Sequence, residues 1–304
     1  IRCFGIDDEL VKFNIYANNV EYEMRNNRRN IIVGDKFANF NTATGQSAVV
    51  YNYTDASNAN SVGFITSSSG LTDGYATTLE AEILFPKKLD ETSIVYVDTN
   101  TISASLFGVH GTVDSGTDTT WASPDAVNFQ VFAVRDELKS ANVKFVLTGT
   151  AGGYVPEISS SLYEEVYDNT RWNLAVRIKP EQFPLKGLVT GTDSDYIVEL
   201  HGVQVEAGEV LQEFTVSGTI TNPPAGFVTG SKRVFVGAHR TNFTGTLLQT
   251  SDVKVNACRY WLDYIEDGAL TGHLLDTENH GAAQPHLYAY PFDTTASYGD
   301  ITKL

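Results

Sequence analysis

Short runs of alternating hydrophobic and polar residues recur along the chain, and they predict β-strands. In the clearest run, 75–86, Leu79, Ala81, Ile83 and Phe85 lie on one side and polar residues between them on the other. The same alternation predicts strands at 47–53, 61–66, 93–97, 103–109, 127–134, 143–148, 172–178, 196–206, 209–219, 233–239 and 246–256.

The connections between these runs are rich in Gly, Asn, Asp and Ser, which favour turns. Helical spacing is confined to two short segments, 135–141 and 267–277. About a dozen strands with short connections are typical of an antiparallel structure rather than of a parallel sheet wrapped by helices. The sequence therefore predicts an all-β, antiparallel two-sheet sandwich with one or two short helices.

We expect a single sandwich domain over 31–292. Residues 1–30 are predicted to form an N-terminal extension or the first strands, and 293–304 a tail or a linker to a following domain. The chain begins without a Met, so we expect it to be a processed product or a segment of a longer polypeptide.

The charge of the chain bears on its partners. With 37 acidic and 21 basic residues the formal net charge is −16, so phosphate backbones and anionic membranes should repel it. No stretch is long and apolar enough to cross a bilayer. We therefore expect neither nucleic-acid binding nor membrane insertion.

The two cysteines, Cys3 and Cys258, are too few for a disulfide framework. A single bridge between them is left open, but Cys258 lies in an alternating run and is predicted to be a small buried side chain. None of the six histidines has a zinc-binding spacing. They are His110, His201, His239, His273, His280 and His286.

Two sets of residues could bind ligands. Aspartates on turns offer oxygen ligands for Ca²⁺, although they also favour the turns themselves. Exposed aromatic rings could stack on sugars, although most aromatic residues of a sandwich belong to its core. The Ca²⁺ candidates are Asp114, Asp118, Asp193 and Asp195, and the glycan-binding candidates are Tyr51, Tyr53, Trp121 and Tyr163.

One segment, 232–281, resembles a known kind of domain. Its strand ends at Gly237, "FTG" follows at 243–245, and "RYW" stands at 259–261. This order is similar to the closing strands of concanavalin A-like and laminin-G-like jelly rolls, and the likeness extends over 75–281. The resemblance implies a jelly-roll sandwich, in which a Ca²⁺ site at a rim loop is common.

Glycosidases of the concanavalin A-like type carry the pattern E-x-D-x-x-E on one strand, where alternate acids point at the sugar. The present chain has Glu80 and Glu82 but Phe85 at the place of the last acid. We therefore predict no catalytic residue here. The two glutamates are expected to form the solvated face of an ordinary strand.

The longer pattern, "GAHR", "FTG", "SDV", "RYW" and "DTENHG", resembles sandwich domains in virion structural proteins of tailed bacteriophages. It implies a non-enzymatic structural or attachment component, in the virion or extracellular. Such a component would assemble with other virion subunits as part of an oligomer and could contact host-surface carbohydrate. The alternatives are a carbohydrate-binding or adhesion module of a secreted bacterial protein and, third, a glycoside hydrolase.

Overall fold

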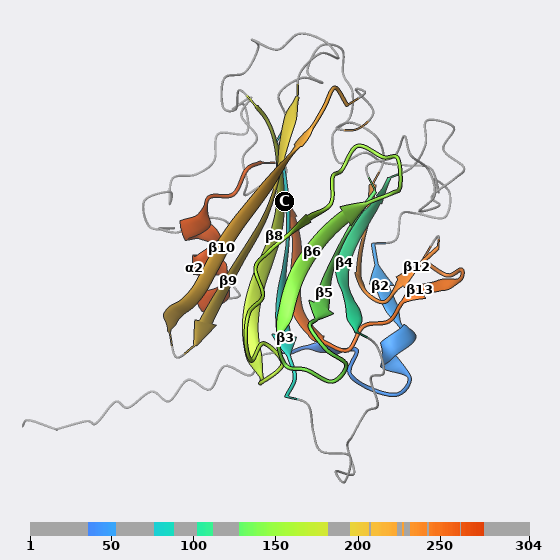
Figure 1. The fold of residues 1–304 in the computed structure, drawn as a ribbon, viewed down its shortest axis with the longest axis vertical. Coiled ribbons are helices and arrows are strands. Elements are labelled where there is room, and N and C mark those ends of the chain that lie inside the picture. The colour runs from blue at the N-terminus through green and yellow to red at the C-terminus, as the bar shows by residue number, and fades with distance from the viewer. Residues whose placement is uncertain are drawn as a thin grey trace, which may run out of the picture. The chain divides into compact units, whose positions relative to one another are not determined.

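Two six-stranded antiparallel sheets pack face to face (Figure 1). The structure is a computed structural model. It describes residues 36–52, 76–87, 102–111, 128–181, 195–206, 208–223, 227, 232–241, 243–261 and 263–276. The predicted extension at 1–30 and tail at 293–304 lie outside the described residues, as do the predicted strands at 61–66 and 93–97.

Sheet A has the longest strands. Every neighbouring pair in it is antiparallel. In spatial order its strands are β1 (Ala38–Asn39), β14 (Lys254–Trp261), β3 (Thr77–Phe85), β8 (Thr170–Pro180), β9 (Tyr196–Glu206) and β10 (Glu209–Ile220).

Sheet B is the second layer and is also antiparallel throughout. In spatial order its strands are β2 (Val49–Tyr51), β11 (Lys232–Gly237), β4 (Ser103–Gly111), β5 (Phe129–Arg135), β6 (Val143–Gly149) and β7 (Ile158–Ser159). Three short elements complete the described part. They are the pair β12 (His239–Arg240) and β13 (Leu247–Gln249), and the 3-10 helix η2 (Gly45–Ser47).

The facing sides of the two sheets share one hydrophobic core. The predicted inward residues of β3, from Leu79 to Phe85, are all part of it. At its centre Phe145 of sheet B packs against Trp172 of sheet A, with ring centroids 4.9 Å apart. The predicted antiparallel two-sheet sandwich is thereby confirmed, while its finer assignment as a concanavalin A-like or laminin-G-like jelly roll stays a prediction.

Helix α2 (Asp267–Leu275) covers part of the opposite, outer face of sheet A. Leu270 of the helix is completely buried, in a second small cluster with Ala175 of β8 and Trp261 of β14. This helix confirms the prediction of a helical segment at 267–277. Among the described residues, no helix has the length and hydropathy that a membrane crossing requires.

Two expected elements and the expected burial of one cysteine differ from the structure. Residues 135–141 form the end of β5 and a turn instead of a helix, because this segment closes the hairpin from β5 to β6. The run 246–256 is divided into β13 and the start of β14. Cys258 is an exposed free thiol rather than a buried side chain, and Cys3, its possible disulfide partner, lies outside the described residues.

Candidate functional site

Ionisable side chains gather on the outer face of sheet A beside helix α2. Strand alternation directs Arg177 and Lys179 of β8 to this face, together with Glu199 and His201 of β9. Arg177 is paired directly with Glu199 across the two strands. Strand β10, at the edge of the sheet, adds Glu213 and Thr215, both exposed.

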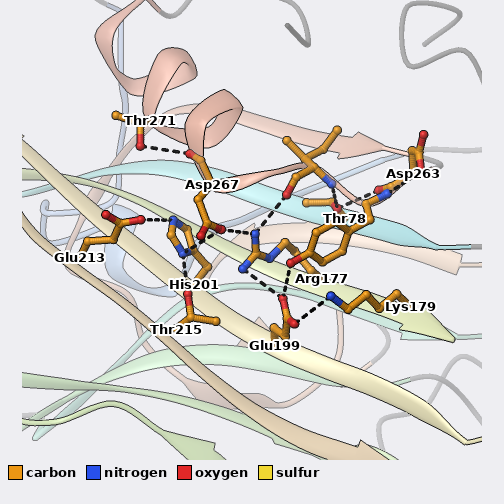
Figure 2. Close-up of polar contacts among 12 residues, drawn as sticks. Thr78, Arg177, Lys179, Glu199, His201, Glu213, Thr215, Asp263, Asp267 and Thr271 are labelled. Atoms are coloured by element: carbon orange, nitrogen blue, oxygen red, sulfur yellow. Dashed lines mark hydrogen bonds and ion pairs between the residues drawn. The ribbon is translucent and has the colours of Figure 1, made fainter. Parts of the chain in front are cut away.

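The segment that links β14 to α2 is tied to strand β3 by the hydroxyl group of Thr78. Thr78 donates to the carbonyl oxygen of Asp263 at 2.8 Å and accepts the backbone N–H of Ile265 at 3.1 Å. These two hydrogen bonds hold the segment before α2 on the sheet, and Asp267, the first residue of α2, lies beside Arg177 and His201 (Figure 2).

The Arg177 guanidinium joins the sheet to this segment. It is buried, 3.0 Å from Glu199, and donates to the carbonyl oxygen of Ile265 at 3.1 Å. It also pairs with the Asp267 carboxylate, and it lies 4.7 Å from the ring centroid of Tyr264. Arg177 is thus held by contacts with both the sheet and the segment before α2, and we call this set of contacts the network. It is ordered before any ligand binds.

Lys179 is the partly exposed cation of the group. Its side chain is 22% exposed, 3.2 Å from Glu199 and 3.9 Å from the Tyr264 ring centroid. The Tyr264 hydroxyl donates to Glu199 at 2.7 Å. Burial, and then this hydrogen bond, raise the pKa of Tyr264, so its hydroxyl keeps its proton at neutral pH.

His201 lies at the centre of the site and is completely buried. Its Nδ1 is 2.9 Å from the Thr215 hydroxyl and 3.7 Å from Asp267 Oδ1. Its Nε2 is 3.9 Å from Glu213 and has no hydrogen-bond partner among the described residues. Burial, and then the charge of Arg177, lower the pKa of His201 to about 4, so the imidazole is neutral at pH 7.

Two half-exposed carboxylates flank this imidazole. The side chains of Glu213 and Asp267 are 44% and 53% exposed. Burial alone would raise the pKa of Asp267, but Arg177 and then His201 lower it below its ordinary value. One ligand atom from each of His201, Glu213 and Asp267 lies within 4.8 Å of the others. The arrangement can accept a proton, bind sugar hydroxyls or hold a cation.

Glu80 does not face solvent as expected. It is completely buried and accepts hydrogen bonds from Asn173 at 2.7 Å and from Trp261 at 2.8 Å, with His273 of α2 also 2.8 Å away. The prediction of a solvated polar face is wrong because α2 covers this part of sheet A. All these contacts are internal, so Glu80 anchors the helix.

Glu82, the second glutamate of the same strand, is also buried. It pairs with Arg171 and accepts a hydrogen bond from Asn256 at 3.1 Å. Burial raises the pKa of Glu82 above its ordinary value despite these partners. It too is held by neighbouring strands rather than presented to a substrate.

Two of the four glycan-binding candidates are described, and both are half-buried. Tyr51 stacks on Phe243 with ring centroids 4.7 Å apart, and Tyr163 stacks on Phe214 at 5.4 Å. Each ring therefore packs against another ring of the sandwich, and its role in glycan binding stays a prediction. Tyr53 and Trp121 lie outside the described residues.

Of the Ca²⁺ candidates, Asp195 alone is described. Its carboxylate accepts the backbone N–H of Asn222 at 3.0 Å, a contact that a turn aspartate makes. The other three, Asp114, Asp118 and Asp193, lie outside the described residues, so Ca²⁺ binding by these aspartates stays a prediction.

The residues that the structure does bring together were not singled out from the sequence. The two-residue spacing of Glu199 and His201, and of Arg177 and Lys179, is the signal that places each pair on one side of its strand. Which strands are neighbours, and that Asp267 approaches His201, depend on tertiary contacts.

No protein family model matches the chain, and no curated protein sequence matches it. Solved structures do. The full-length tailspike protein 2 of a bacteriophage of Escherichia coli O157:H7 is 11% identical, with a TM-score of 0.40, over 83% of this chain and 29% of its own. The enzymatically active domain of a bacteriophage tailspike protein 2 is 10% identical, with a TM-score of 0.39, over 83% and 32%. An alginate lyase from Klebsiella pneumoniae is 14% identical, with a TM-score of 0.30, over 62% and 60%.

This chain thus spans about a third of the tailspike protein or less. The expectation that it is not an enzyme is corrected, because its structural matches include an enzymatically active domain and a lyase. With TM-scores of 0.40 and below, these likenesses assign neither a substrate nor a site residue.

Proposed function

We propose that this chain is a carbohydrate-directed component of a phage particle, and that it binds and cleaves polysaccharide at the outer face of sheet A. The resemblance of 232–281 to virion sandwich domains supports the assignment to a particle. The single observation that carries the site is the buried His201, neutral and flanked by two half-exposed carboxylates, at the border between α2 and the exposed side of β10.

Binding would use the charged groups at the surface of this network. Lys179, Glu213 and Asp267 are the partly exposed members, and hydrogen bonds between sugar hydroxyls and charged groups are stronger than those between neutral groups. Arg177 holds Asp267, and Tyr264 holds Glu199. Because these side chains are already fixed, the exposed groups need little reordering when a ligand binds.

Cleavage of a polysaccharide needs a group that accepts a proton and a group that donates one. The groups of this site that reach the surface and could exchange protons with a substrate are the half-exposed carboxylates of Glu213 and Asp267, which flank the buried His201. Oxygens of Glu213 and Asp267 lie within 4.8 Å of each other, near the roughly 5 Å separation of the carboxyl groups in retaining glycosidases. These features favour cleavage over binding alone.

The test is an incubation of the purified chain with neutral and acidic polysaccharides, alginate among them. Binding is read on a glycan array, hydrolysis by newly formed reducing ends, and elimination by the ultraviolet absorbance of unsaturated uronate products. The site variant is Glu213→Gln, and the matched control is Glu209→Gln, an exposed glutamate of the same strand outside the network.

We expect the parent chain and Glu209→Gln to cleave one class of polysaccharide equally well. Glu213→Gln should lose about 100-fold or more in rate, as expected for the loss of an acid–base group. Full activity of Glu213→Gln would place the reaction elsewhere, and absence of binding and products with every polysaccharide would refute the function.

A further inference from the structure

We propose that His201, Glu213 and Asp267 form a binding site for a divalent transition-metal ion such as Zn²⁺. Their ligand atoms lie within 4.8 Å of one another. Zinc binds imidazole nitrogen and carboxylate oxygen at about 2.0–2.2 Å, so two such ligands are roughly 3.4 Å apart around a tetrahedral ion. Small rotations of the two half-exposed carboxylates would close this difference.

The imidazole of His201 is already positioned as a metal ligand. Its Nδ1 faces the Thr215 hydroxyl at 2.9 Å, which fixes the ring and leaves Nε2 as the atom that can bind an ion. Nε2 is buried without a hydrogen-bond partner among the described residues, and Glu213 is 3.9 Å from it. Asp267 Oδ1 is 3.7 Å from the other nitrogen, Nδ1, so binding of an ion at Nε2 requires the half-exposed Asp267 side chain to turn toward Nε2. An unpartnered buried polar atom is costly, and an ion at this place would satisfy it.

The donor set selects among metals. One imidazole nitrogen and two carboxylates suit Zn²⁺ and its transition-metal neighbours, whereas Ca²⁺ and Mg²⁺ prefer a shell of oxygens only. Arg177 occupies Oδ1 of Asp267, which leaves the second oxygen of that carboxylate for the ion. Glu199 is a third carboxylate near this site, and the cations beside it are Arg177 and Lys179. Three negative charges and two positive ones leave the group with a net negative charge, which favours binding of a cation.

Three protein ligands leave at least one coordination position open. That position would face the exposed side of β10, where Glu213 and Thr215 reach solvent. A bound ion could present a water molecule or a sugar oxygen there. This role in carbohydrate chemistry rests on the proposed function, but metal binding itself does not.

The test is a direct titration of the full chain after dialysis against EDTA. ZnCl₂ and CoCl₂ are added in a calorimeter, and the visible absorption of Co²⁺ reports nitrogen and oxygen ligands in a low-symmetry site. We expect one equivalent to bind, with MgCl₂ and CaCl₂ at least 10-fold weaker. Glu213→Gln should weaken binding 10-fold or more, and Glu209→Gln should leave it unchanged.

Thr215→Val tests the positioning of the imidazole. It removes the hydroxyl that faces Nδ1 while leaving all three ligands, and loss of such a partner typically lowers metal affinity 10–100-fold. Both changed side chains are exposed, so the variants should fold, which circular dichroism checks.

Absence of binding, or equal binding by the parent chain and Glu213→Gln, would overturn the proposed metal site. The polysaccharide assay, repeated in EDTA, separates the two proposals. Metal binding without any polysaccharide cleavage refutes the proposed function and leaves the metal site standing. Cleavage by a chain that binds no metal refutes the metal site and leaves the proposed function standing.

Discussion

Nδ1 of His273 lies 2.8 Å from Oε1 of Glu80, and neither side chain is exposed to solvent. The pair joins helix α2 to strand β3, in the interior of sheet A. Burial alone would raise the pKa of Glu80, but His273, and then Arg259 and Asn173, hold it below its ordinary value. The carboxylate is therefore charged, and it contacts α2 through His273.

We expect Glu80→Gln to destabilise the fold by about 3 kcal/mol, because it removes the buried negative charge that lies 3.5 Å from the Arg259 guanidinium. Urea unfolding at pH 7 measures the change. Glu137→Gln, in the exposed turn after β5, is the control and should stay within about 0.5 kcal/mol of the parent. A similarly small effect of Glu80→Gln would show that the pair does not stabilise the helix.

The buried pair of His110 and His239 predicts a loss of stability in acid. Burial, and then the charge on His110, lower the pKa of His239 from 6.5 to about 3. As the pH falls below 6.5, the unfolded chain binds a proton that the folded chain excludes. The stability that neutral His239 contributes is thus full above pH 6.5 and declines down to about pH 3.

His239→Phe should remove this dependence and keep the packing on Phe235, whose ring centroid is 5.2 Å from that of His239. Between pH 7 and 4.5 the free energy of unfolding should fall by about 2 kcal/mol less in the variant than in the parent. Urea titrations at the two pH values measure it. Equal losses in both proteins would mean that His239 titrates normally in the fold.

The sequence was informative about which residues share a side of a strand. Leu79, Ala81, Ile83 and Phe85 lie in the core as their alternation predicts, because a period of two is a property of the strand alone. The prediction that the opposite side of this strand faces solvent was wrong for Glu80, because alternation does not reveal that α2 packs there.

The candidate site was missed for a related reason. His201 and Glu213 become neighbours through the pairing of β9 with β10, and Asp267 reaches them because Thr78 fixes the segment before α2. Neither contact follows from local spacing. The perturbed pKa of His201 likewise arises from burial and from Arg177, which is on another strand.

Gly202 of β9 leaves room for an aromatic ring of the core. A Cβ atom at this position would lie 2.3 Å from Cε1 of Phe214 and 2.8 Å from Cδ2 of Leu174. We expect Gly202→Ala to lower the free energy of unfolding by about 1–3 kcal/mol, because a well-packed core cannot take an added methyl group without strain. Thermal and urea unfolding measure this, and an unchanged stability would mean that Phe214 moves away freely.

Gly268, the second residue of α2, should respond in the opposite direction. A Cβ atom there meets nothing within 4 Å, and alanine favours a helix over glycine by up to about 1 kcal/mol. We expect Gly268→Ala to raise the free energy of unfolding by about 0.5 kcal/mol, measured by urea unfolding.

The double variant, Glu80→Gln with Gly268→Ala, tests whether the Glu80 charge keeps α2 docked on the sheet. If α2 stays folded on the sheet without the Glu80 charge, the two effects add, as they do for independent sites. If the charge holds the helix down, α2 is already undocked in the Glu80→Gln protein, and alanine at position 268 gains nothing there. Amide exchange in Leu270 and Leu274, both buried in the parent, separates the two cases directly.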